Sequence, residues 1–255
     1  MSDDDKAKEL IGLGSDIAGS VAGAAVGALG GPVGIAVGAV AVPVVTRTVR
    51  MAIEFAHRSL SHREKVRVGA GLAFAYNKIA EYLEEDRQPR SDGFFDQDLG
   101  GRSPNDEILE GVLLKCKNEH EEKKTRLLGN IYANTAFMPE VSVEAANWLL
   151  QEAQDLTYRQ LCILALVEHA RNKGVSWGPN DGDPAFEMEY KALEGMLARD
   201  SSREATQLQR ETGEGRSIIG LSRVGRLCYQ VMGLNEIPEA DLRNLSVHFP
   251  RAFEQ

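Results

Sequence analysis

Hydrophobic positions along the chain recur mainly at helical spacing, every three or four residues, and strand-like alternation is nearly absent. Ser61 and Glu64 have the spacing of a capping box, so a helix is expected to begin near His62. The stripe before this point, with arginines on its other side, predicts a basic amphipathic helix: Val49, Ile53, Ala56 and Leu60. These patterns predict a mostly α fold.

The middle of the chain contains one clear interruption. Residues Gln88–Gly101 read QPRSDGFFDQDLGG and predict a loop. Ser103, followed by proline, then predicts a helix start, and the helical pattern continues to Pro139. A charged band, Glu119–Arg126, lies in its middle, and residues Glu119–Lys124 are interpreted as a solvated helix face.

Two further helices are expected after Pro139. Residues Ser142–Gln154 predict a helix that directs Trp148 and Leu149 inward. Thr157 and Gln160 form a second capping-box pattern ahead of LCILALVEH, which predicts a buried helix.

The last part of the chain has a different pattern of predicted elements. A helix is expected from Phe186 to about Arg199, then a polar stretch to Arg216, and then a helix capped by Ser222. The order of helix, helix, β-ribbon and helix is typical of a winged helix, with Ser217–Leu221 as the return strand. A plain helical bundle is an equal alternative.

The most unusual pattern is an uncharged run of 30 residues, Ile17–Thr46. Glycine recurs in it at every fourth position, so on a helix the glycines form a groove in which a second helix can approach to backbone contact. Pro32 follows two glycines and predicts a kink or a tight hairpin. The first ladder is Gly19, Gly23, Gly27 and Gly31. The second ladder is Gly30, Gly34 and Gly38.

This run is apolar but poor in large side chains, with eight Ala and eight Val against one Leu and two Ile. Membrane anchors usually carry more large aliphatic residues and a border of Trp or Tyr. Three interpretations stay open: a buried soluble hairpin, a constitutive anchor, and a membrane element that inserts and oligomerises. The third is favoured, and these glycines with Pro32 are its candidate helix-packing residues.

Basic residues follow the run. They are candidates for contact with an anionic lipid surface, worth about 1 kcal/mol each, or with an anionic ligand such as a nucleotide. A solvated helix face is the alternative interpretation. The candidates are Arg47, Arg50, Arg58, Arg63, Lys65 and Arg67.

Composition limits the remaining functions. The chain has 255 residues, 43% of them hydrophobic, and a net charge of -9, which argues against a general nucleic-acid coat. Its three cysteines, Cys116, Cys162 and Cys228, are expected to be buried thiols. His120 has no second histidine at metal-binding spacing. Two GxG sequences, Gly12–Gly14 and Gly69–Gly71, do not continue as a nucleotide fingerprint. An enzyme, a cofactor and a metal site are therefore not expected.

The stretch AGSVAGAAVGALGGPVGIAVGAV, ahead of a cytoplasmic helical domain, resembles membrane-disrupting effectors of bacterial anti-phage defence. Two segments are similar in residue pattern to the abortive-infection alpha family, LTYRQLCILALVEH and IIGLSRVGRLCYQVMGL. The whole architecture resembles Hailong-type channel effectors. The resemblance implies an oligomeric channel that is silent until an oligonucleotide signal binds. A partner nucleotidyltransferase would make that signal, and the open channel would depolarise the infected cell.

These interpretations predict three regions. Residues 1–46 form the membrane-active segment, residues 47–154 the helical core and oligomerisation region, and residues 155–255 a helical sensor or regulatory region. The predicted function is a conditional pore in antiviral defence, with membrane lipid and further copies of the chain as partners. We expect it at the cytoplasmic face of the bacterial inner membrane, or in the cytoplasm before activation. The alternative is a soluble helical binding or regulatory protein that packs the Gly/Ala/Val run as a hairpin.

Overall fold

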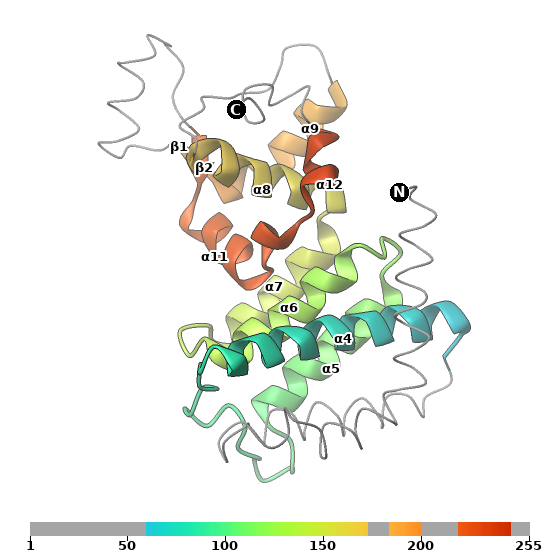
Figure 1. Ribbon diagram of the computed structural model, residues 1–255, viewed down its shortest axis with the longest axis vertical. Coiled ribbons are helices and arrows are strands. Elements are labelled where there is room, and N and C mark those ends of the chain that lie inside the picture. Colours follow the sequence, from blue (N-terminus) through green and yellow to red (C-terminus); the bar gives the residue numbers. More distant parts are fainter. Residues whose placement is uncertain (1–59, 173–183, 200–218, 246–255) are drawn as a thin grey trace. The chain divides into compact units, whose positions relative to one another are not determined.

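The computed structural model describes residues 60–172, 184–199 and 219–245, and within them it has eight α-helices and one pair of short strands (Figure 1). The predicted mostly α class is confirmed. The chain divides into two compact units, Met1–Asp155 and Leu156–Gln255. The functional roles assigned above to the three regions stay predictions.

The first unit is a bundle in which one helix is surrounded by three others. Helix α6 contacts α4, α5 and α7, and 13 of its residues are buried, Arg126 being the exception. Because nearly every side of α6 faces protein, it forms the centre of the core. The four helices are α4 (His62–Glu84), α5 (Pro104–Asn118), α6 (Lys124–Phe137) and α7 (Val143–Asp155).

The predicted helix starts are confirmed by their caps. The Ser61 hydroxyl accepts from the Glu64 backbone N–H while the Glu64 carboxylate accepts from the Ser61 N–H, which completes the capping box of α4. Ser103 and Asp106 cap α5 in the same reciprocal way. Each box pairs backbone donors that have no partner inside the helix. Capping is local, so the sequence is enough to find it.

The prediction of continuous helix from Ser103 to Pro139 is wrong at Glu119–Lys123. Helix α5 ends at Asn118, and the backbone of Glu119 is extended before α6 begins at Lys124. The interpretation of Glu119–Lys124 as a solvated helix face is also wrong, since Glu119 and Lys124 are both buried. Their charges are paired with each other, and that pairing makes burial tolerable.

The predicted loop Gln88–Gly101 is confirmed, and Arg90 attaches it to the bundle. The Arg90 guanidinium donates to the carbonyl oxygens of Thr135 at 3.2 Å and Val141 at 2.7 Å. Its other nitrogens bind the carboxylate of Asp92. The buried arginine thus satisfies a carbonyl in the last turn of α6, which has no partner within the helix, and a carbonyl in the turn that follows.

One side-chain orientation predicted for helix α7 is wrong. Leu149 is buried as predicted, but Trp148 is 37% exposed. The buried face of α7 consists of Ala146, Leu149, Leu150 and Ala153. At 100° per residue, position 148 lies on the opposite side of the helix.

The second unit is built around α8 (Tyr158–Asn172), the predicted buried helix, whose residues from Leu161 to Val167 are buried. The Thr157–Gln160 capping box is also confirmed. The other helices are α9 (Pro184–Ala192), α11 (Arg223–Val231) and α12 (Glu239–Arg243), with 3₁₀ turns η1 (Glu194–Met196) and η2 (Leu234–Glu236).

The predicted return strand is found as β2 (Ile219–Leu221), and residues 217–218 lie outside the described residues. Its partner β1 (Leu197–Arg199) pairs antiparallel, with Leu197 opposite Leu221. The predicted helix from Phe186 to about Arg199 is therefore wrong in its second half, since α9 ends at Ala192. Pairing with a strand distant in sequence overrides local helix propensity there.

Ser222 caps α11 as predicted and also fastens it to η1. Its hydroxyl accepts from the Gly225 N–H at 3.1 Å and donates to the Gly195 carbonyl at 3.0 Å. A Cβ atom on Gly225 would lie 2.1 Å from the Met196 carbonyl oxygen. The sequence Leu-Ser-x-x-Gly therefore specifies both a helix start and a close backbone contact.

Candidate functional site

Most of the predicted functional residues lie outside the described residues. These are the glycines of both ladders, Pro32, Arg47, Arg50 and Arg58. None of the helices within the described ranges has the length and apolar character needed to cross a membrane. The structure describes Arg63, Lys65 and Arg67, which lie in the first two turns of α4.

Arg63 and Lys65 are exposed at the beginning of α4. Arg67 differs from them. It is half-buried, and its Nη2 donates to the carbonyl oxygen of Lys117 at 2.7 Å. That carbonyl belongs to the last turn of α5, whose carbonyl oxygens have no N–H donors within the helix and attract cations. Arg67 thus attaches α4 to α5, while Arg63 and Lys65 are accessible to an anionic surface.

A second contact links the start of α4 to the end of α5. Lys117 Nζ lies 3.8 Å from the Glu64 carboxylate that caps α4. The hydrogen bond with Ser61 is the main cause that lowers the pKa of Glu64, and Lys117 and Arg67 lower it further. Glu64 is therefore ionised at neutral pH, as both its cap and its ion pair require. The cap of α4 is visible in the sequence, whereas no residue near Lys117 indicates its contact with Glu64.

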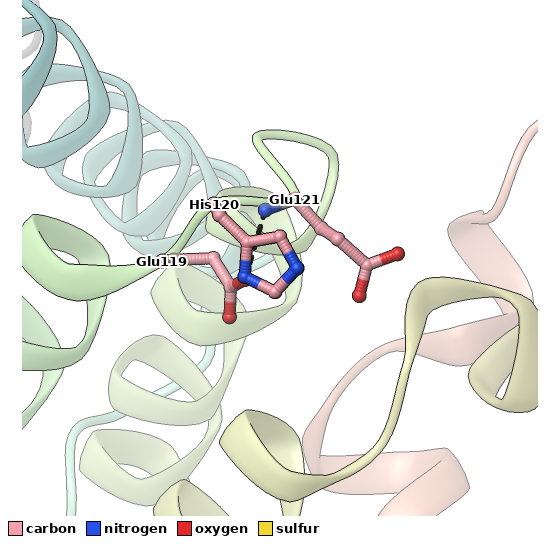
Figure 2. A group of neighbouring side chains, drawn as sticks. All are labelled: Glu119, His120 and Glu121. Atoms are coloured by element: carbon pink, nitrogen blue, oxygen red, sulfur yellow. Dashed lines mark hydrogen bonds and ion pairs between the residues drawn. The ribbon is translucent and has the colours of Figure 1, made fainter.

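A different cluster lies between α5 and α6. Glu119, His120 and Glu121 have potential ligand atoms within 4.8 Å of one another, the arrangement that a metal ion could use. Figure 2 shows the Glu119 carboxylate beside the His120 ring and the Glu121 carboxylate pointing away on the other side of the ring. The Glu121 backbone N–H donates to Glu119 Oε1 at 2.9 Å.

Lys124 provides the positive charge in this cluster. Its Nζ lies 2.8 Å from Glu119 Oε2 and 3.8 Å from Glu121 Oε2, and it donates to the Gln154 carbonyl at 3.1 Å. The side chains of Lys124 and Glu119 are only 2% and 3% exposed. An ammonium group already neutralises the carboxylate that a cation would need, so the cluster is a structural ion pair that joins the α5–α6 loop to α7.

Glycine does provide a close helix contact within the first unit. A Cβ atom on Gly129 of α6 would lie 2.5 Å from the Gly71 carbonyl oxygen of α4, and one on Gly71 would lie 2.4 Å from Cys116 Sγ. Gly71 belongs to one of the GxG sequences that were not assigned to phosphate binding. Its absent side chain instead lets α4 approach α5 and α6, the kind of contact that the N-terminal ladders predict for their own segment.

The three cysteines are buried thiols, as predicted. Burial raises the pKa of Cys116 far above its usual value, and the nearby Glu119 charge raises it further. A thiol with this pKa is protonated at neutral pH and is a poor nucleophile. Cys116 therefore serves packing between α4 and α5.

Comparison of the chain with protein-family models, with curated proteins and with solved structures finds no match.

Proposed function

We propose that this protein is a conditional membrane pore or ion-channel effector in bacterial anti-phage defence, inactive until a signal, such as an oligonucleotide, binds. The observation that carries the proposal is the uncharged run Ile17–Thr46 with its two glycine ladders. Side-by-side helices can pack through such faces while each satisfies its own backbone hydrogen bonds in lipid.

The junction described above supports this proposal. A pore-forming segment needs a fixed attachment to the part of the protein that stays outside the membrane. At the start of α4, Glu64 and Arg67 connect this helix to Lys117 at the end of α5, while Arg63 and Lys65 are exposed beside them. Exposed cations at this place would favour contact with anionic lipid headgroups.

The proposed mechanism has three steps. Several copies assemble through their helical bodies, a signal releases the glycine-rich segments, and these segments insert together. The few large side chains in the run make insertion of one copy marginal, so assembly and insertion would be coupled. The positive residues after the run would keep the helical body in the cytoplasm.

Dye release from anionic lipid vesicles tests the proposal. The full chain is added over a range of concentrations, with and without mixed short oligonucleotides. The wild type should release dye, whereas Gly23→Leu with Gly27→Leu should not, since leucines fill the ladder face. The matched control is Ala18→Leu with Ala25→Leu, which adds the same side chains to the opposite face and should preserve release.

Two results would contradict the proposal: no release by the folded wild type under any of these conditions, or equal release by the ladder variant. Either result favours the second candidate, a soluble binding or regulatory protein that packs the run as a hairpin. The Gly71–Gly129 contact is the observation in favour of that candidate, because it uses glycine for close helix packing without a membrane.

A further inference from the structure

Helix α4 is buried on two opposite sides in its first half. One side packs on α5 and α6, where Gly71 lies against Cys116. Val66, Gly69 and Ala73 lie about 140–160° around the helix from Gly71. Val66 is nevertheless only 7% exposed and Ala73 only 8%, and Gly69 is buried as well. The packing of α4 on α5 and α6 does not account for the burial of this second side.

The second side, which we call the outer face of α4, consists of Val66, Gly69 and Ala73. Further along the helix on the same side, Asn77 and Glu84 are exposed. Whatever covers α4 there is therefore confined to its first half. The outer face is buried within a single chain, so a second copy is not what covers it.

The part of the chain directly before α4 fits the outer face. Residues 47–59 lie outside the described residues, and their sequence predicts an amphipathic helix with Val49, Ile53 and Ala56 in its apolar stripe. Successive positions of this stripe are separated by four and then three residues. The outer face, followed backwards along α4, has the same two separations, as the pairing of antiparallel helices requires.

The connection between the two segments is short. Only Leu60 and Ser61 separate residues 47–59 from α4, and the Ser61 backbone is extended at the cap. Helices joined by so short a connection are usually antiparallel neighbours. As a helix, residues 47–59 would span about 20 Å, whereas the outer face extends over about 10 Å of α4. The segment is therefore long enough to cover the whole face.

We propose that residues 47–59 fold back on α4 and pack their apolar stripe on its outer face. Gly69 has no side chain, so the two helices can approach closely at the middle of the contact. Gly69 and Gly71 would then serve opposite sides of α4, one toward this segment and the other toward α5. The facing pairs are Val49 with Ala73, Ile53 with Gly69, and Ala56 with Val66.

This packing makes the basic segment part of a fixed surface. The side of the predicted helix opposite its stripe has three arginines and one glutamate: Arg47, Arg50, Arg58 and Glu54. With the stripe on α4, these side chains face outward, and Arg63 and Lys65 are exposed at the start of α4. The role of this surface at an anionic membrane rests on the proposed function, whereas the packing of the two helices does not.

Disulfide cross-linking in the full chain tests the proposal. Val49→Cys with Ala73→Cys, and separately Ala56→Cys with Val66→Cys, should form an intramolecular disulfide on mild oxidation, about fivefold or more above the control. The control is Thr48→Cys with Ala73→Cys, because Thr48 is next to Val49 in sequence but about 100° away around the helix. Mass spectrometry of proteolytic peptides identifies the bond. The native cysteines are buried thiols and provide the background measured in the wild type.

Two results would overturn the proposal. The first is a cross-link yield no greater than that of the control for both pairs, in variants that circular dichroism shows to be folded. The second is the formation of disulfide-linked dimers in place of cross-linked monomers, because the segment would then pack on a second copy. If one of the two pairs prevents folding, the other pair decides.

Dye release measured on the same samples separates this proposal from the pore. The glycine ladders precede residue 47, so neither cross-link involves them. Cross-linking in the expected pattern, without dye release by any sample, would contradict the pore and leave the packing on α4 standing. Dye release by the wild type, with cross-linking of both pairs at the level of the control, would contradict the packing on α4 and leave the pore standing.

Discussion

Each unit of this protein is built around one buried helix, but the two helices are buried in different ways. Helix α6 places polar residues in the core, where Tyr132 donates to Asn105 at 2.8 Å and Tyr82 donates to Asn134. The buried side chains of α8 between Leu161 and Val167 are aliphatic apart from Cys162. A buried polar group needs its own partner, so α6 fits one arrangement, whereas an aliphatic helix tolerates repacking.

In the second unit, the polar contacts that fix one arrangement of the helices lie at the helix ends. Tyr158 donates to the Asp241 carboxylate of α12 at 2.8 Å, Arg159 pairs with Glu189 of α9, and Ser222 fastens α11 to η1. The first unit is thus specified by contacts inside its core and the second by contacts at its periphery. We expect core substitutions in the first unit to have the larger effects on stability.

The largest effect is expected for Lys124→Met. The change leaves the buried Glu119 carboxylate without its cation, which should lower the free energy of unfolding by about 3–5 kcal/mol. Urea denaturation of the full chain, followed by circular dichroism, measures it. The variant that combines Lys124→Met with Glu119→Leu should recover much of the loss. A single-variant loss below about 1 kcal/mol would contradict the account of this ion pair.

Glycine substitutions compare the two units directly. Gly129→Ala drives a Cβ atom toward the backbone of α4 and should cost about 1–3 kcal/mol. Gly225→Ala meets the Met196 carbonyl, but η1 and β1 have three residues each and can shift, so its cost should be smaller. Gly195→Ala, with nothing within 4 Å of its added Cβ, is the control. A greater loss of unfolding free energy for Gly225→Ala than for Gly129→Ala would contradict this expected order.

Removal of the α11 cap should have a moderate effect. Ser222→Ala deletes the acceptor for the Gly225 N–H and the donor to the Gly195 carbonyl, and should cost about 1 kcal/mol. Hydrogen exchange of the α11 amides measures the loss locally. Ser222→Asp keeps a cap acceptor and should retain most of the protection. Equal protection in wild type and Ser222→Ala would show that the cap does not hold this region.

The smallest effect is a dependence on pH at the periphery of the first unit. The hydrogen bond from Arg90 is the main cause that lowers the pKa of Asp92. A lowered folded-state pKa contributes stability above the unfolded value, about 3.9, and this contribution is lost as the pH falls through the folded pKa. Because Asp92 is largely exposed, Asp92→Asn should cost less than about 1 kcal/mol at pH 7. The difference from wild type should shrink as the pH falls below about 3.9 and vanish below the folded-state pKa, and a constant difference would exclude this cause.

The sequence predicted what local chemistry decides. Helix starts at Ser61, Ser103 and Thr157 follow from side chains that bind backbone groups three residues away. The break at Glu119 could not be predicted, because burial of its charge depends on Lys124 and on the distant Gln154 carbonyl. The same holds for β1, which depends on pairing with a strand beyond residue 218.

The candidate site, too, could be predicted only where neighbouring residues in the sequence decide it. The exposed positions of Arg63 and Lys65 fit both a contact surface for anions and a solvated helix face, so the contact surface stays a prediction. Arg67 has a structural contact with a residue 50 positions away. Separation in sequence is the common cause, since neither spacing nor composition encodes which distant backbone oxygen an arginine meets. The regular spacing of the glycine ladders is visible in the sequence alone. Experiment must decide what packs against them.

Recording of ionic current across a planar anionic bilayer tests the central claim most directly. Addition of the full chain with mixed short oligonucleotides should produce discrete current steps, which the Gly23→Leu, Gly27→Leu variant should lack and the Ala18→Leu, Ala25→Leu variant should retain. A folded, self-associating wild type that gives no steps, or a ladder variant that gives the same steps, would contradict the account.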